Sequence, residues 1–452
     1  MADQHAAHSH AHSPSMSASL SASLPASVSR HAKRLTLAIV VPAAVLTLIG
    51  LVLLWPGKVA VEPWTGPPHY AAVVEGVERV ECPPPPPDAV PNQHQMCGTA
   101  LVQLQDGPEA GRTVETNLPS GPGAPTVGVG DDVIVIQGDS FEEPGARVYD
   151  IIDHERGTQI WLLLLVFALT VIAFGRWRGL TALAGLAVTF AFLLVFVVPA
   201  ILAGSSPLLV AIVGSSAIML VVLYLTHGFN TPTSMAVLGT LASLALTGGL
   251  AISCTWALKL TGVADEQASF LTIQYGNVNM LGLLLAGIII GALGVLDDVT
   301  ITQAYTVTEL AAANPAMRFI DLYRAASRVG RAHITSVINT IVLAYAGASL
   351  PLLLLLTAGP GQDNGGWLAM IKSEQLTQEI VRSVVGTLGL IAAVPITTAL
   401  AAFAIRGRAP STVSTPSSPG DFPPAPPTPR PRRLDPLEAA WEKDVPQEWA
   451  NP

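Results

Sequence analysis

Long apolar stretches dominate residues 158–405 and leave only short polar connections between them. Several of these stretches reach about 18 residues or more, the length that a helix needs to cross the core of a bilayer. A further apolar stretch near the beginning of the chain would form an anchor helix. The pattern predicts eight membrane-spanning helices, which are Leu35–Trp55, Gln159–Gly175, Gly179–Ala203, Pro207–Thr226, Thr233–Leu258, Val278–Leu296, Ile334–Thr357 and Ile380–Ile405.

Residues 56–157 interrupt this pattern with short runs of β-branched and apolar residues that Gly and Pro separate. Runs of this kind predict short strands, and their number favours a small β-barrel of the OB or SH3-like type. The expected strands are Tyr70–Val80, Thr99–Gln105, Arg112–Asn117, Asp132–Gln137 and Arg147–Ile152. The predicted fold class is therefore an α-helical multi-pass membrane protein with a small β-barrel-like domain.

Two of the three cysteines, Cys82 and Cys97, fall in the β-rich segment. A disulfide between them is chemically permitted if the segment lies outside the cytoplasm. Sequence alone does not show that the geometry closes such a bond, so the pairing stays open.

Both ends of the chain are low in complexity, with Ser and Ala over 1–34 and Pro and Ser over 406–452. Such segments cannot bury enough apolar surface to fold, so we expect disordered tails. Basic residues cluster at one side of the expected spans. The positive-inside rule then places both tails in the cytoplasm and residues 56–157 outside the membrane. The basic residues assigned to the cytoplasmic side are Arg30, Lys33, Arg34, Arg176, Arg178, Arg318, Arg324, Arg328, Arg331, Arg406 and Arg408.

The composition supports a membrane protein, because 50% of the residues are hydrophobic and only 12% are charged. Soluble domains average about 25% charged residues. The sequence lacks a P-loop, a Rossmann glycine fingerprint and an HExxH motif, and it has no basic patch for nucleic acid. The spans also offer no evident nucleophile–base pair. We therefore expect neither enzyme activity nor a cofactor. The expected partners are the lipids of the bilayer and an unidentified ion or small-molecule substrate.

The most concentrated polar chemistry stands at the end of an apolar helix, where Asp297 and Asp298 are adjacent. Ionisable groups in a span are costly and are functional candidates by default. At 100° per residue, Asp298 shares a face with Gly287 and Gly291, a GxxxG pair that favours close helix packing. We therefore expect Asp298 to point into packed helices, whereas Asp297 lies about 100° around the helix and need not share that environment. The alternative is that both acids simply end the span at the cytoplasmic surface.

A second polar face opens the span that begins at Ile334, where Ser336, Asn339 and Thr340 fall on one side of a helix. These side chains are expected to meet Asp298 across a helix pair. A half-buried carboxylate with hydroxyl and amide neighbours suits a proton relay or a cation site. The alternative is structural hydrogen bonding between helices. The candidate proton or ion site comprises Asp297, Asp298, Thr302, Ser336 and Asn339.

Two further segments carry polar residues near the same end of the spans. The turn at Tyr224–Thr231 contains His227 and Asn230, and its polarity is also typical of an ordinary loop. The linker Pro315–His333 reads as an amphipathic interfacial helix with arginines on one side. These arginines either meet anionic lipid headgroups or pair with an acid of the preceding helix.

The runs GVLDDVTITQAYTVTEL and RVGRAHITSVINTIVLAYAGASLPLLLL resemble the YibE/F family of bacterial membrane proteins. The resemblance extends from about residue 35 to residue 405, and DDVTITQ is its most specific part. It implies a multi-pass protein of the bacterial plasma membrane, but it implies no particular activity.

A weaker resemblance, in the order of features, is to SecD/SecF and to RND-type permeases. Those proteins couple proton flow to work through membrane acids, which Asp297 or Asp298 would match, while Arg331, Thr335 and Ser336 would match the opening of the next span. Two additional spans and a smaller insert depart from that pattern. The resulting hypothesis is a proton- or cation-coupled transporter or energy-coupling permease. The alternative is a non-transporting scaffold or sensor whose β-rich domain binds an envelope partner.

Overall fold

The computed structural model describes residues 30–57, 66–82, 97–121, 123–139, 147–358 and 371–405. The predictions for both tails lie almost entirely outside these residues. Only residues 30–34 of the first tail are described, and they form the first turns of helix α1 (Arg30–Leu53).

A five-stranded antiparallel sheet occupies the β-rich segment, with the order β3-β2-β1-β4-β5. The strands are β1 (His69–Val80), β2 (Cys97–Leu104), β3 (Thr113–Asn117), β4 (Asp132–Asp139) and β5 (Arg147–His154). Each of them overlaps one of the five predicted strands. Alternating residues face a buried cluster that includes Val74, Val102, Val133 and Val135, as expected for a sheet with one covered side.

The predicted barrel-like closure is not confirmed, because the described edge strands β3 and β5 do not pair through their backbones. Side chains connect these edges instead. Arg147 and Tyr149 of β5 reach the carboxylate of Glu109, which lies in the turn that precedes β3. A strand as short as β3, with five residues, offers few backbone groups for a second ladder. The sheet therefore stays open.

Cys82 and Cys97 form a disulfide, with their Cα atoms 5.1 Å apart. Cys97 begins β2, and Val80 at the end of β1 is its partner in the antiparallel register. The pairing of β1 with β2 thus brings the two cysteines together from positions 15 residues apart in the chain.

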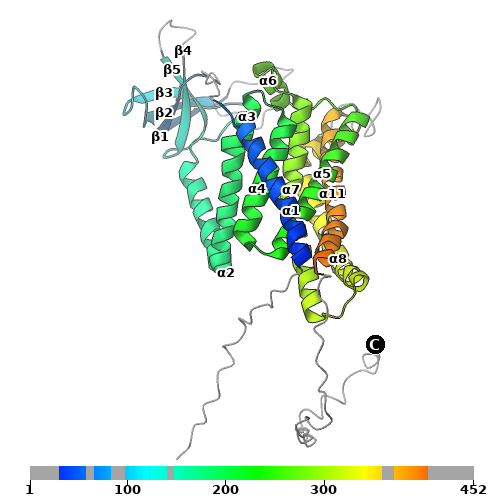
Figure 1. The fold of residues 1–452 in the computed structure, drawn as a ribbon. Helices are drawn as coiled ribbons and strands as arrows, with labels where there is room; N and C mark the ends of the chain where they lie inside the picture. The colour runs from blue at the N-terminus through cyan, green and yellow to red at the C-terminus, as the bar shows by residue number, and fades with distance from the viewer. Residues whose placement is uncertain are drawn as a thin grey trace, which may run out of the picture. The chain divides into compact units, whose positions relative to one another are not determined.

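The rest of the described chain is helical (Figure 1). The helices are α2 (Gly157–Phe192), the π-helical turn η1 (Leu193–Val197), α3 (Val198–Leu202), α4 (Pro207–His227), α5 (Thr231–Ala257), α6 (Glu266–Gln274), α7 (Met280–Ala313), α8 (Phe319–Ala348), α9 (Leu350–Ala358) and α11 (Glu374–Ile405). Helices α5, α7 and α11 pack against one another and form the centre of the bundle.

Five of the described helical segments are long and apolar enough to cross a membrane, fewer than the eight predicted. They are Gly157–Leu202, Pro207–His227, Thr231–Ala257, Met280–Ala313 and Glu374–Ile405. The described apolar part of α1, Ala38–Leu53, is shorter than a full span. The span expected at Ile334–Thr357 is divided at Ser349, which lies between the end of α8 at Ala348 and the beginning of α9 at Leu350.

The first of these segments contains a sharp turn at Arg176, whose backbone has φ 51° and ψ −128°. A Cβ at Gly179 would overlap the carbonyl of Val171. Along a straight helix, these two positions would be about 12 Å apart. The chain therefore folds back on itself, and the two limbs lie side by side (Figure 1). They correspond to the predicted spans Gln159–Gly175 and Gly179–Ala203.

Candidate functional site: an acid pair and a polar pocket on α7

Helix α7 carries the acid pair and is continuous from Met280 to Ala313. The side chain of Asn279 caps its beginning by accepting a hydrogen bond from the backbone N–H of Gly282 at 2.8 Å. The helix then continues for 34 residues, a length of about 51 Å. Because a bilayer core is about 30 Å thick, one end of α7 extends beyond a single crossing. Asp297 lies about 26 Å along the helix.

The two acids differ in burial, in the opposite sense to the prediction. Asp298 is exposed, whereas Asp297 is half-buried, and its Oδ1 atom is buried without a hydrogen-bond partner among the described residues. The glycines on the face of Asp298 are also exposed, and a Cβ added at Gly287 would meet no described residue within 4 Å. The expectation that Asp298 points into packed helices is therefore wrong.

The apolar residues of α7 explain this orientation. Leu293, Leu296 and Ala304 are buried against the neighbouring helices, and burying such side chains removes more apolar area from water than burying glycine does. The large side chains consequently set the rotation of α7, and the glycine stripe is left on the opposite side. Helical phase alone could not decide between these two faces.

Ser336 and Asn339 do not meet either acid. Both are exposed, as is Thr302 of α7, and no hydrogen bond joins them to Asp297 or Asp298 in the described chain. The inner side of α8 is formed instead by small and apolar residues, which are Leu322, Ala326, Ser327, Gly330 and Ile334. The predicted contact is therefore wrong in this structure, and whether these residues belong to an ion site stays a prediction.

The buried polar contacts of α7 come from the next residues of the DDVTITQ run. Gln303 donates from Nε2 to the carbonyl of Ala326 in α8 at 3.0 Å and to Oγ1 of Thr398 in α11 at 2.7 Å. The hydroxyls of Thr300 and of Thr240 in α5 are 2.6 Å apart. Sequence reasoning missed Gln303 as a contact residue. Its signal was the three-residue spacing from Thr300, which places both side chains on one helix face.

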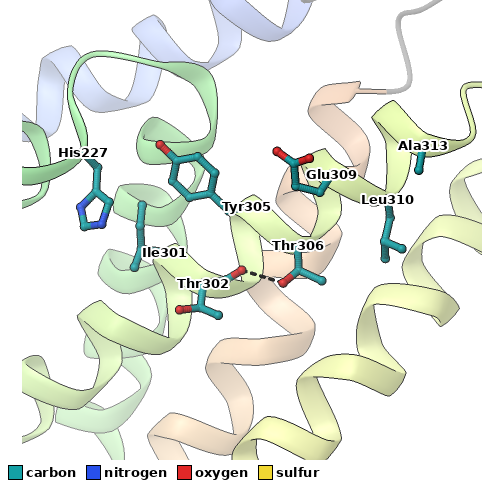
Figure 2. Close-up of a pocket in the computed structure, with 8 residues that line it drawn as sticks. All are labelled: His227, Ile301, Thr302, Tyr305, Thr306, Glu309, Leu310 and Ala313. Atoms are coloured by element: carbon teal, nitrogen blue, oxygen red, sulfur yellow. Dashed lines mark hydrogen bonds between the residues drawn. The ribbon is translucent and has the colours of Figure 1, made fainter. Parts of the chain in front are cut away.

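A shallow pocket of about 690 Å³ follows the acid pair along α7. It is lined by His227, Ile301, Thr302, Tyr305, Thr306, Glu309, Leu310 and Ala313. Figure 2 shows the ring of Tyr305 between His227 and the carboxylate of Glu309. The hydroxyl of Thr306 donates to the carbonyl of Thr302 at 2.8 Å, which leaves it satisfied within the helix. The pocket therefore brings together three titratable side chains, His227, Tyr305 and Glu309.

The turn between α4 and α5 contacts this pocket, so its polar residues do more than close a loop. Asn230 caps α5 by accepting from the N–H of Thr233 at 2.8 Å. Its Nδ2 group donates to the carbonyl of His227 at 2.7 Å and to the hydroxyl of Tyr305 at 3.1 Å. His227 also interacts electrostatically with Asp298. The capping residue thus connects the turn to α7 beside the acid pair.

Several titratable side chains lie near this end of the bundle. They are Asp297, whose Oδ1 is buried without a hydrogen-bond partner among the described residues, the exposed Asp298, and the pocket residues His227, Tyr305 and Glu309. Most of the polar atoms of these side chains are oxygens, and hard cations prefer oxygen ligands. The described residues contain no group of three or more His, Cys, Asp or Glu side chains that could hold a metal ion.

The long apolar helices indicate a membrane protein with several spans. The chain belongs to the YibE/F-like protein family, whose model matches residues 163–407. This range begins within α2, extends through α11, and excludes the sheet and α1. No curated protein and no solved structure matches the chain. The likeness to SecD/SecF and RND-type permeases therefore stays a prediction.

Proposed function

We propose that this protein is a proton- or cation-coupled membrane transporter or energy-coupling permease in which Asp297 carries the coupling ion. One observation supports this proposal most directly, namely that Oδ1 of Asp297 is buried and has no hydrogen-bond partner in the part of the chain that the structure describes. A bare carboxylate in such surroundings is costly. Binding a proton or a cation removes that cost, which gives the site a reason to take up an ion. Asp297 thereby replaces Asp298 as the preferred carrier.

Asp298 would then act as the exchange group between Asp297 and water. It is exposed, adjacent to the carrier, and within electrostatic range of His227. The pocket with Tyr305 and Glu309 continues this route along α7. A relay of this kind needs neighbouring groups that gain and lose protons readily, and histidine and carboxylates do so.

The proposed arrangement in a bacterial plasma membrane has eight crossings and both termini in the cytoplasm. Five of the described segments are long and apolar enough to cross, and the first of them would cross twice, once with each limb of α2. Helix α1 and the α8–α9 pair would supply the other two crossings. The disulfide of Cys82 and Cys97 suits an oxidising compartment. This supports placing the sheet outside the cytoplasm.

Flux through vesicles tests the proposal. The full chain would be reconstituted into proteoliposomes that contain a pH-sensitive dye, and pH or Na⁺ gradients would be imposed. Asp297→Asn removes the charge at nearly constant volume and should reduce the flux to that of empty vesicles. Asp298→Asn should slow the flux without abolishing it, because the carrier remains.

Asp321→Asn is the control, since Asp321 is a partly exposed acid that pairs with Arg318 at 3.0 Å outside the pocket. It should leave the flux unchanged. If Asp297→Asn folds and transports like the parent, the assignment of the carrier is wrong. If the parent itself carries no flux under any gradient, the scaffold or sensor hypothesis is favoured.

A further inference from the structure

The first half of α8 presents three exposed arginines, Arg324, Arg328 and Arg331. Their spacing of four and three residues places them in one stripe, which extends about 10 Å along the helix. None of the three forms an ion pair with a described residue. Arg318, by contrast, is held by Asp321 at 3.0 Å. The stripe therefore offers three uncompensated guanidinium groups to its surroundings.

The opposite side of α8 fixes the direction in which these arginines point. Ala326, Ser327 and Gly330 are buried against the bundle. At Gly330 the approach is so close that a Cβ would lie 2.6 Å from Cγ1 of Val394 and 2.7 Å from Oε1 of Gln303. The helix cannot rotate without breaking these contacts. The arginines consequently cannot turn inward to pair with the acids of α7.

The beginning of α8 has the character of an interfacial helix. The rings of Phe319 and Tyr323 lie on consecutive turns with their centroids 6.2 Å apart, and aromatic residues gather where bilayers meet water. Helices with a basic face and an apolar face bind anionic membrane surfaces. The guanidinium group also matches the oxygens of a phosphodiester in a two-pronged geometry.

We propose that Arg324, Arg328 and Arg331 bind the phosphodiester headgroups of anionic phospholipids in the surrounding bilayer. A bound headgroup neutralises the stripe from outside, while Gln303 holds the same helix from inside through the carbonyl of Ala326. Anionic lipid would thereby stabilise the position of α8 against α7 and α11. This inference does not depend on the proposed transport function.

Native mass spectrometry of the full chain in detergent tests the proposal directly. Phosphatidylglycerol or phosphatidylcholine would be added at increasing concentration, and the bound lipids counted. The parent protein should retain phosphatidylglycerol in preference to the zwitterionic lipid. The triple variant Arg324→Gln/Arg328→Gln/Arg331→Gln should bind phosphatidylglycerol roughly 10- to 100-fold more weakly, because each arginine near an anionic surface contributes to attraction.

Arg318→Gln is the matched control, because it removes an arginine at the N-cap of α8 that is already paired with Asp321. It should change lipid binding little. Undiminished binding of phosphatidylglycerol by the triple variant, or an equal loss in the control, would overturn the proposal. Displacement of the lipid by excess inorganic phosphate would overturn it as well, since the stripe would then be a general anion site. If the triple variant does not fold, the single Gln variants should each show a partial loss.

Discussion

At the scale of single residues, Glu109 organises the edge of the sheet. Its carboxylate accepts hydrogen bonds from Arg112 at 2.9 Å, from Arg147 at 2.8 Å and from the hydroxyl of Tyr149 at 3.3 Å. Burial opposes ionisation of this group, but the charge of Arg112 and the hydrogen bonds of Tyr149 and Arg147 outweigh it. Together they hold the pKa of Glu109 below its ordinary value of 4.5.

This lowered pKa gives the stability of the sheet a definite pH dependence. A carboxyl whose pKa is lower in the folded state contributes stability that is fully present above its ordinary pKa. The contribution is lost as the pH falls through the lower folded value. Glu109→Gln removes it at every pH. The difference in thermal midpoint between parent and variant should therefore shrink as the pH is lowered from neutral to below about 4.5.

Circular dichroism of the full chain at a series of pH values would measure this difference. Glu78→Gln is a suitable control, because it alters a carboxyl on β1 whose side chain forms no ion pair in the described sheet. The control should show no such convergence. A constant difference between Glu109→Gln and the parent across the pH series would contradict the role assigned to Glu109.

At the scale of elements, Gly330 controls how closely α8 approaches the bundle. A Cβ at this position would press against Val394 and against the amide of Gln303, which bridges three helices. Gly330→Ala should therefore destabilise the protein by about 1–3 kcal/mol, the usual cost of overpacking a core. The expected readout is a lower thermal midpoint of the purified chain.

Gly347→Ala provides the matched control on the same helix, because a Cβ there meets nothing within 4 Å. The control should be neutral or slightly stabilising, since alanine favours helix over glycine by about 1 kcal/mol. Equal effects of the two substitutions would show that helix propensity, and not the approach of α8 to its neighbours, decides the outcome.

The elements also show which features sequence patterns can predict. Alternating β-branched residues predicted five strands that the structure contains, because period-two patterns report directly which side chains face a core. The sequence also predicted the break at Arg176 between two spans, because charge between apolar runs indicates a turn. The open sheet was not predictable, because closure depends on pairing between β3 and β5, which are distant in the sequence.

The candidate site was predicted only in part, and helix rotation is the reason. The DDVTITQ run correctly indicated where polar residues enter the bundle, but Thr300 and Gln303 make the buried contacts. Asp298, which was expected to be the buried acid, is exposed, and Asp297 is the more buried of the two. A glycine stripe and an apolar stripe predict opposite orientations of the same helix. The areas that neighbouring helices bury decide between them, and a single sequence does not contain those areas.

At the scale of the whole molecule, the disulfide offers a test of sidedness. Cys82 and Cys97 close a loop between β1 and β2, and such bonds persist in oxidising compartments. If the sheet lies outside the cytoplasm, Cys82→Ser should leave Cys97 as a free thiol that faces the outside. A membrane-impermeant maleimide added to intact cells should then label the variant. The parent should stay unlabelled until it is reduced.

Cys254 lies in α5 and is the remaining cysteine of the chain, so both proteins would carry Cys254→Ala to remove its background. Breaking the bond should also lower stability, because a closed loop of this size contributes about 3 kcal/mol by restricting the unfolded chain. Labelling reports the side of the membrane on which the sheet lies, whereas the change in stability reports the contribution of the disulfide. A free Cys97 that reacts only after the cells are permeabilised would place the sheet on the cytoplasmic side. That result would reverse the proposed orientation and, with it, the side from which Asp298 and the pocket on α7 exchange ions.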